Sequence, residues 1–467
     1  MMTHCNQLKN KITASRIQTG MRREMCVTVM ILLVFCLFVT PSMKQPAFSD
    51  GLFQENLPPA TVGDRQASLF TKVSPPVLTS DTHQKRFFEL RLYDAKTGDN
   101  ITNVNYFITV TKAGKLLMRD LFYSKIGPLR IEIIPRPGIV TVYGSPEPFL
   151  GGYMSEGDHI TVQGPVLLEG GLYHFEIEIF GIDRPNNIFK QDSAPRFDSY
   201  LSVGDVFNEN LTYNKIVYNS TLISYYDKIR NFKFDPTKLV ASWEMPFDWN
   251  LSRINAVNIF VHEEFKVSKN FSQFSNTTSF NATANGQPVL GRSLAIDPFS
   301  SDKALIIHYL LTKNDIVKLA GIKDISEKSN NTMKFMLTPM KSQLGQSSTD
   351  LNTDTGGIHA ALLWSPNPPV AGSEATLTLN FNDALSDSSL KADVNYEISV
   401  KDSTNGKEII KKDNLIALNG TGTQKITFPD SGTYQIEIDV KSLKYTGQTT
   451  ADSARNGIAR GFVILPK

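Results

Sequence analysis

The stretch GLYHFEIE at residues 171–178, with its near copy GTYQIEID at residues 432–439, decides the fold class of this 467-residue chain. In both copies apolar and polar residues alternate, as in a β-strand with one buried face. A glycine opens each copy, and a tyrosine follows two residues later. The same half-buried strand is therefore expected at two distant places in the chain.

Four further blocks recur around these strands in the same order. They are ASLF and PPV at 67–77 with AALL and PPV at 360–370, LRLYD at 90–94 with LNFND at 379–383, VNYFITV at 104–110 with VNYEISV at 394–400, and DSA at 192–194 with DSA at 452–454. An ordered set of repeated blocks indicates one domain used twice. The first copy is longer between its VNY and glycine-tyrosine blocks, which predicts an inserted hairpin around residues 131–164.

Tyr173 and Tyr434 each have the spacing of a tyrosine corner, which opens strand F of an immunoglobulin domain. Phe175 and Ile436 stand where an antibody domain has its second cysteine. We therefore predict an all-β protein with two immunoglobulin-like antiparallel β-sandwich repeats that flank a distinct, mainly-β middle domain. Thr312 and Asp315 have the spacing of a capping box, which predicts one helix in the middle domain that ends at Gly321.

The predicted organisation follows from the limits of the repeat and from local composition. The boundaries are a signal peptide or N-terminal membrane anchor at 1–49, a lead-in linker at 50–63, repeat 1 at 64–203, the middle domain at 204–340, a polar linker at 341–356, and repeat 2 at 357–467.

With these motifs the repeats resemble the exported immunoglobulin-like β-sandwich repeat proteins of ammonia-oxidising archaea. The resemblance lies in the run from D-x-x-x-G through V-N-Y-x-I-x-V to G-x-Y-x-I-x-V, and it covers residues 64–203 and 357–467. These motifs are structural. The resemblance therefore implies a fold and an exported location, but no active site.

The N-terminal segment predicts export. Residues 25–39 carry no charge, basic residues precede them, and a small-x-small cleavage candidate lies at 47–49, which is the pattern of a secretory signal. An uncleaved anchor with the body outside is the alternative, although a span needs about 17–25 residues. Cleavage and the true start, Met1 or Met21, stay open. The expected location is extracellular or at the cell surface, with membrane contact only through this segment.

Cysteine and charge usage exclude several classes of function. All three cysteines, Cys5, Cys26 and Cys36, precede residue 50, so the body has no disulfide, cysteine nucleophile or blue-copper site. Residues 50–467 hold 42 basic and 45 acidic residues, which gives no electrostatic reason for nucleic-acid binding. Nine Asn-x-Ser/Thr sequons are candidate glycosylation sites. These are Asn100, Asn210, Asn219, Asn250, Asn270, Asn276, Asn281, Asn330 and Asn419.

Two groups of residues are candidates for a site. His159 and His174, with Met154 nearby, would provide copper ligands if they converged; the alternative is that both histidines belong to ordinary strand and turn surfaces. Trp243, Phe247 and Trp249 would form a binding surface for sugar rings or a protein partner if they were exposed; the alternative is that they fill the core of the middle domain.

The His262-Glu-Glu run lacks the second histidine of a zincin helix and lies on a predicted strand, so it is not a candidate. No cofactor and no catalytic residue is predicted. The expected function is a non-enzymatic envelope protein with structural, adhesion or binding roles, whose partner is an envelope protein or a glycan. The alternative is an extracellular hydrolase or a metal-handling (copper) protein with its site in the middle domain or repeat 1.

Overall fold

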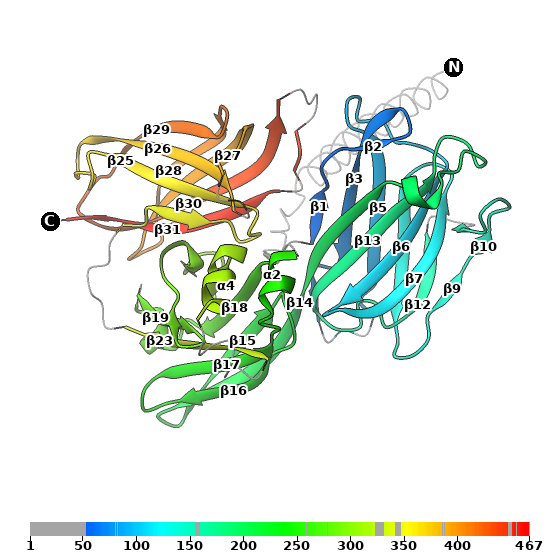
Figure 1. The fold of residues 1–467 in the computed structure, drawn as a ribbon. Coiled ribbons are helices and arrows are strands. Elements are labelled where there is room, and N and C mark those ends of the chain that lie inside the picture. Colours follow the sequence, from blue (N-terminus) through cyan, green and yellow to red (C-terminus); the bar gives the residue numbers. More distant parts are fainter. Residues whose placement is uncertain are drawn as a thin grey trace, which may run out of the picture. The chain divides into compact units, whose positions relative to one another are not determined.

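The computed structural model describes residues 53–79, 81, 83–154, 159–256, 259–277, 279–322, 331–340, 347–384, 386, 388–446, 451–453 and 455–466. All of them belong to the compact unit Ser49–Lys467. They form five β-sheets and a few short helices (Figure 1), which confirms the all-β class. The segment 1–49 with its cysteines, and Asn330, lie outside the described residues.

The first repeat is built from two sheets. One has the order β1-β3-β5-β8-β12-β9, with β2 beside β3. Its strands are β1 (Gln54–Asn56), β2 (Ala60–Val62), β3 (Arg65–Ser74), β5 (Arg86–Asp94), β8 (Leu129–Pro135), β9 (Thr141–Tyr143) and β12 (Ile160–Gly164). The core lies between the sheets, where Phe88 of this sheet stacks on Phe175 of the other with ring centroids 4.0 Å apart.

The second sheet runs β10-β11-β7-β6-β13-β14-β15-β18-β22-β21, with β4 beside β14. Its strands are β4 (Val77–Leu78), β6 (Val104–Lys112), β7 (Lys115–Ser124), β10 (Ser145–Pro146), β11 (Tyr153–Met154), β13 (Gly171–Gly181), β14 (Arg196–Tyr213), β15 (Ile216–Ser224), β18 (Val261–Ser268), β21 (Leu294–Asp297) and β22 (Ala304–Leu311). A 3₁₀ turn, η1 (Gln191–Ser193), precedes β14. The long strand β14 pairs with β13 up to Val203 and with β15 from Asp205 (Figure 1), so one strand serves both repeat 1 and the middle domain.

Repeat 2 has the sheets β24-β25-β26-β29 and β28-β27-β30-β31. Its strands are β24 (Asp350–Asn352), β25 (Ile358–Ser365), β26 (Glu374–Asp383), β27 (Ala392–Asp402), β28 (Glu408–Ala417), β29 (Thr421–Thr427), β30 (Gly432–Tyr445) and β31 (Gly457–Leu465). The order β25-β26-β29 matches β3-β5-β8, and β28-β27-β30-β31 matches β7-β6-β13-β14. The ASLF/AALL, LRLYD/LNFND, VNY and glycine-tyrosine blocks therefore lie on corresponding strands of the two repeats.

Both predicted tyrosine-corner hydrogen bonds are present. The Tyr173 hydroxyl donates to the Glu169 carbonyl at 2.5 Å, and the Tyr434 hydroxyl donates to the Asp430 carbonyl at 2.8 Å. In each case the acceptor lies four residues before the tyrosine. The residue two positions after the tyrosine, Phe175 in repeat 1 and Ile436 in repeat 2, is fully buried. The two corners thus have the same local geometry.

Replacing Tyr434 with phenylalanine is expected to lower the free energy of unfolding by about 1 kcal/mol, because the ring stays in place while one hydrogen bond is lost. Urea denaturation followed by circular dichroism measures this. Tyr143→Phe is the control. It removes a long, exposed hydrogen bond to Gln163 at 3.3 Å, which water can replace, so the denaturation midpoint should stay nearly unchanged. An unchanged midpoint for Tyr434→Phe would show that its hydrogen bond does not stabilise the repeat.

The middle domain packs a five-stranded sheet, β16-β17-β23-β19-β20, against the β15-β18-β22-β21 part of the long sheet. Its additional elements are β16 (Arg230–Asp235), β17 (Val240–Pro246), β19 (Phe280–Ala284), β20 (Gln287–Pro288), β23 (Thr332–Pro339), α2 (Leu251–Ala256), α3 (Ser272–Ser275), α4 (Lys313–Ala320) and η2 (Gly291–Ser293). Helix α4 confirms the capping-box prediction, since Thr312 and Asp315 exchange both hydrogen bonds and Gly321 follows the last turn.

Both predicted linkers are wrong in the described residues. In the segment 50–63, β1 and β2 pair with β3. In the segment 341–356, β24 pairs with β25, and Asn352 and Asp354 are buried. The polar composition of both segments is typical of linkers, but polar side chains in them, such as Glu55 and Asn352, form hydrogen bonds within the fold. The insertion in repeat 1 contains an antiparallel pair of successive strands, β10 and β11, as predicted for a hairpin. It also adds β12, which runs parallel to β8 and antiparallel to β9.

All eight sequon asparagines within the described residues are exposed. Asn210 and Asn219 lie directly opposite each other on β14 and β15. Within the described part of the chain, no helix has both the length and the apolar character needed to cross a membrane.

Candidate functional site

The predicted copper ligands do not converge. His159 lies beside β12, where its Nε2 is 2.8 Å from Oε2 of Glu132. His174 lies on β13 in the other sheet, where its Nε2 is 2.7 Å from Oδ1 of Asp198. Met154 lies on the short strand β11. Closeness in sequence does not bring the two histidines together, because β12 and β13 belong to different sheets.

The predicted aromatic binding surface is also wrong. The exposed fractions of Trp243, Phe247 and Trp249 are 1%, 2% and 5%. Trp243 stacks between Phe265 and Phe335, and the Trp249 indole nitrogen donates to the Thr332 carbonyl at 2.9 Å. These aromatic side chains belong to the core of the middle domain.

A cavity of about 590 Å³, which we call the junction cavity, lies where repeat 1, the middle domain and repeat 2 meet. Most of its wall is apolar or aromatic, including Leu57, Tyr93, Leu172, Tyr200, Phe260 and Tyr445. The Gly356 backbone (φ +69°) packs flat against the Phe260 ring, so closely that a Cβ there would overlap the ring. The wall of the cavity thus includes residues from repeat 1, the middle domain and repeat 2.

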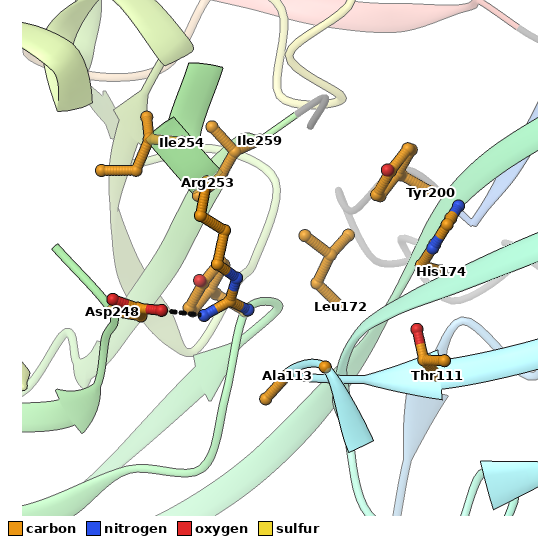
Figure 2. Close-up of a pocket in the computed structure, with 11 residues that line it drawn as sticks. Thr111, Ala113, Leu172, His174, Tyr200, Asp248, Arg253, Ile254 and Ile259 are labelled. Carbon is orange, nitrogen blue, oxygen red and sulfur yellow. Dashed lines mark hydrogen bonds and ion pairs between the residues drawn. The ribbon is translucent and has the colours of Figure 1, made fainter. Parts of the chain in front are cut away.

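A smaller cavity of about 130 Å³, the side cavity, shares Leu172, Tyr200 and Ile259 with the junction cavity. Figure 2 shows Arg253 and Asp248 on one side and Tyr200 and His174 on the other. The Arg253 guanidinium is 2.7 Å from Asp248. The His174 ring stacks on Tyr200 with centroids 4.4 Å apart, which fixes the orientation of a side chain that lines both cavities.

Polar groups enter the junction cavity from both repeats. Glu55 on β1 accepts hydrogen bonds from the Ser199 hydroxyl at 2.7 Å and from the Tyr200 backbone at 2.9 Å. From repeat 2, Arg455 donates to Asp383 at 2.8 Å and to the Tyr445 hydroxyl at 3.1 Å.

One hydrogen bond at the cavity wall joins repeat 1 to repeat 2. The side-chain amide nitrogen of Asn56 on β1 donates to Asp452. The Tyr93 hydroxyl donates to the side-chain oxygen Oδ1 of Asn56 at 3.2 Å. The cavity therefore combines an apolar wall with a few oriented polar groups, as is typical of small-molecule sites.

Burial raises the pKa of Glu55, in the wall of this cavity, to about 7, although hydrogen bonds from Ser199 and Tyr200 oppose the shift. A raised pKa means that the folded protein holds this proton more tightly than the unfolded chain does. The stabilisation is complete below pH 4.5 and is lost as the pH rises to about 7.

Glu55→Gln keeps the side chain neutral at every pH and should remove this loss. Between pH 4 and pH 8, the free energy of unfolding of the variant relative to that of the wild type is therefore expected to rise by about 2 kcal/mol. This is less than the full pKa shift implies, because the Glu55 side chain keeps some solvent contact. Urea denaturation at both pH values measures the difference. A difference that does not change with pH would contradict the prediction.

The second polar region is a buried polar interface between the middle domain and repeat 2. Arg460 on β31 lies at its centre, 3.0 Å from Asp354, 3.3 Å from Asp297 and 3.3 Å from Glu437. Burial raises the pKa of Asp354 to about 6, although Arg460 opposes the shift. For Asp297 burial acts in the same direction, but the charge of Arg460 and the hydrogen bonds from Ser300 and Phe299 together outweigh it, and the pKa is lowered. Arg460 thus links β21 of the middle domain to repeat 2.

The same interface contains His262, Glu264 and His308. Glu264 on β18 lies directly opposite His308 on β22, and all three side chains are at most 1% exposed. His262 Nε2 and His308 Nδ1 are 3.2 Å apart. The neighbouring Glu263 points to the other face of β18, where the Ser224 hydroxyl donates to it at 2.6 Å and burial raises its pKa well above the ordinary value.

The sequence analysis did not identify this cluster, because it considered the second histidine only within the same segment. His308 comes from a neighbouring strand 46 residues later. The available signal was three consecutive ionisable residues, His262 to Glu264, in a strand that also contains the apolar residues Val261, Phe265 and Val267. Glu55 and Asp354 were missed because their segments, 50–63 and 341–356, were interpreted as linkers.

Comparison with protein-family models gives no match, and neither does comparison with curated protein sequences. Among solved structures, a Salmonella alpha-2-macroglobulin variant aligns at 7% identity and a TM-score of 0.18, covering 87% of this chain and 33% of that one. A polysaccharide lyase aligns at 9% identity and a TM-score of 0.16, covering 85% of this chain and 46% of that one. The chain thus spans less than half the length of either structure, and similarities this weak carry no argument about function.

Proposed function

We propose that this chain is an exported, non-enzymatic binding protein of the cell envelope, and that it holds a small, largely apolar ligand in the junction cavity. Two immunoglobulin-like repeats and the middle domain act as the rigid frame. Export is supported by the N-terminal segment of the sequence, which has the pattern of a secretory signal. The exposure of all eight described sequon asparagines is compatible with glycosylation outside the cell.

The observation that carries the proposal is the composition and position of the junction cavity. Its volume of about 590 Å³ falls within the range of small-molecule sites, which are often found between domains. Its wall is mainly apolar, so ligand binding would release water from apolar surface. Glu55 and Arg455 lie in the same wall and would orient a polar group of the ligand.

The neutral apolar fluorophore N-phenyl-1-naphthylamine tests this proposal. The wild type should bind it saturably, with increased and blue-shifted emission. Leu172→Trp places a larger side chain between the two cavities and should weaken binding at least about tenfold, the equivalent of 1.4 kcal/mol. Leu116→Trp, at an exposed position outside the cavity, is the matched control and should bind as the wild type does.

Absence of saturable binding by the wild type, or equal binding by Leu172→Trp when its urea midpoint is unchanged, would overturn the proposal. A glycan or an envelope protein remains the expected class of larger partner. Of the alternatives to a binding protein, only metal handling is favoured by a specific observation, the cluster around His262 and His308.

A further inference from the structure

We propose that His262, Glu264 and His308 bind one divalent transition-metal ion of borderline softness, with Zn²⁺ as the representative case. The site lies within the buried polar interface and is independent of any ligand in the junction cavity. It would join β18 and β22 at the surface that repeat 2 covers.

The strand register positions all three side chains. Glu264 and His308 are direct cross-strand partners, and His262 lies two residues before Glu264 and therefore on the same face. Their candidate ligand atoms all lie within 4.8 Å of one another. His262 Nε2 is 3.2 Å from His308 Nδ1 and 3.8 Å from Glu264 Oε1. In a tetrahedral zinc site with bonds of about 2.0–2.1 Å, neighbouring ligand atoms lie roughly 3.3 Å apart. The two histidine nitrogens already have this spacing, and the carboxylate would have to move closer by up to about 1.5 Å.

Surrounding groups fix the orientation of the ligands. The Tyr225 hydroxyl donates to Oε1 of Glu264 at 2.9 Å, and the Lys266 ammonium is 2.7 Å from Oε2 of the same carboxylate. The Tyr225 ring also stacks on the His262 ring with centroids 4.7 Å apart. Such outer contacts position metal-binding side chains and strengthen binding.

The charge of the interface also suits a divalent cation. Among the described residues, ion pairs join four carboxylates, those of Glu264, Asp297, Asp354 and Glu437, to two side chains with a permanent positive charge, Lys266 and Arg460. When all four are ionised, two negative charges are in excess within a buried region, where uncompensated charge is costly. One divalent ion would balance them.

The donor set indicates the class of metal. Two imidazoles and one carboxylate favour Zn²⁺, Cu²⁺ or Ni²⁺ over Mg²⁺ and Ca²⁺, which prefer oxygen donors. Because the ligands are buried, we expect the metal to be incorporated during folding. The Phe260 ring, 6.1 Å from the His262 ring, lies in the wall of the junction cavity and separates that cavity from the site.

The full chain unfolded in urea and refolded with ZnCl₂ or with EDTA tests the site. After desalting, the protein refolded with zinc should retain about one equivalent of zinc and have a higher urea midpoint than the EDTA sample. His262→Gln and His308→Gln should retain less than about a tenth of an equivalent and lose the midpoint shift. His174→Gln, which alters a histidine-carboxylate pair outside the site, is the matched control and should behave as the wild type.

Refolding the wild type with CoCl₂ gives a second measurement that does not depend on the variants. Cobalt held by nitrogen and oxygen ligands in a tetrahedral site absorbs visible light much more strongly than the aqueous ion does. If the glutamine variants fail to fold, absence of this absorption from the wild type overturns the proposal. Absence of retained zinc in the wild type, or equal retention in folded glutamine variants, also overturns it.

Discussion

Arg460→Met is expected to lower the free energy of unfolding by about 3–5 kcal/mol, because it leaves buried carboxylates without their cation. The arginine side chain is 5% exposed, and Asp354 and Asp297 beside it are 5% and 1% exposed. Methionine fills much of the same volume, so the loss would come from charge rather than from a cavity. Urea denaturation followed by circular dichroism measures the change.

The pH dependence distinguishes lost charge pairing from lost packing. In the wild type the lowered pKa of Asp297 stabilises the fold above its ordinary titration range. Without Arg460, burial would raise the pKa of Asp297 and raise that of Asp354 further, so the folded variant would take up protons as the pH falls. The deficit relative to the wild type should therefore be largest near pH 8 and smaller near pH 5.

Arg253→Met is the matched control, since its ion pair with Asp248 is more than a third exposed on both sides. It should cost less than about 1 kcal/mol. A similar loss for both variants, or a deficit for Arg460→Met that does not change with pH, would show that the buried polar interface does not depend on Arg460 as a charge partner.

Trp249→Ala is expected to cost about 3–5 kcal/mol, because removal of a buried aromatic ring leaves a cavity. The ring lies 4.5 Å from that of Phe247, and its indole nitrogen would no longer donate to the Thr332 carbonyl. The loss should therefore appear as a lower urea midpoint for the middle domain, measured by circular dichroism.

Leu251→Ala, two residues further along and 41% exposed, is the control and should change the free energy of unfolding by less than about 0.5 kcal/mol. If Trp249→Ala kept full stability but lost binding to cell envelopes, the aromatic run would be a binding surface and its place in the core would be wrong.

Several features could be predicted because they depend on short sequence intervals. The corner of Tyr434 needs only a hydroxyl and a carbonyl four residues apart. Helix α4 needs only Thr312, Asp315 and Gly321 at their correct spacing. The strands of both repeats follow from alternation with period two, which describes the faces of a strand wherever the strand lies.

The candidate sites could not be predicted in this way, because each joins distant segments. Glu55 reaches the junction cavity only because β1 pairs with β3, and the polar sequence around it is equally typical of a linker. His262 and His308 meet through the register of β18 and β22. The burial of Trp249 depends on β23 providing the Thr332 carbonyl.

Local alternation, turn chemistry and repetition were enough to establish an all-β chain in which one set of sequence blocks occurs twice. They specify which residues turn inward, because side-chain direction is set by the backbone within a few residues. They do not specify what an inward residue meets. That depends on which strands pair and which modules pack together, and these contacts depend on burial and charge summed over hundreds of residues. For this reason Arg460, Glu264 and Glu55 acquire partners only in the tertiary structure.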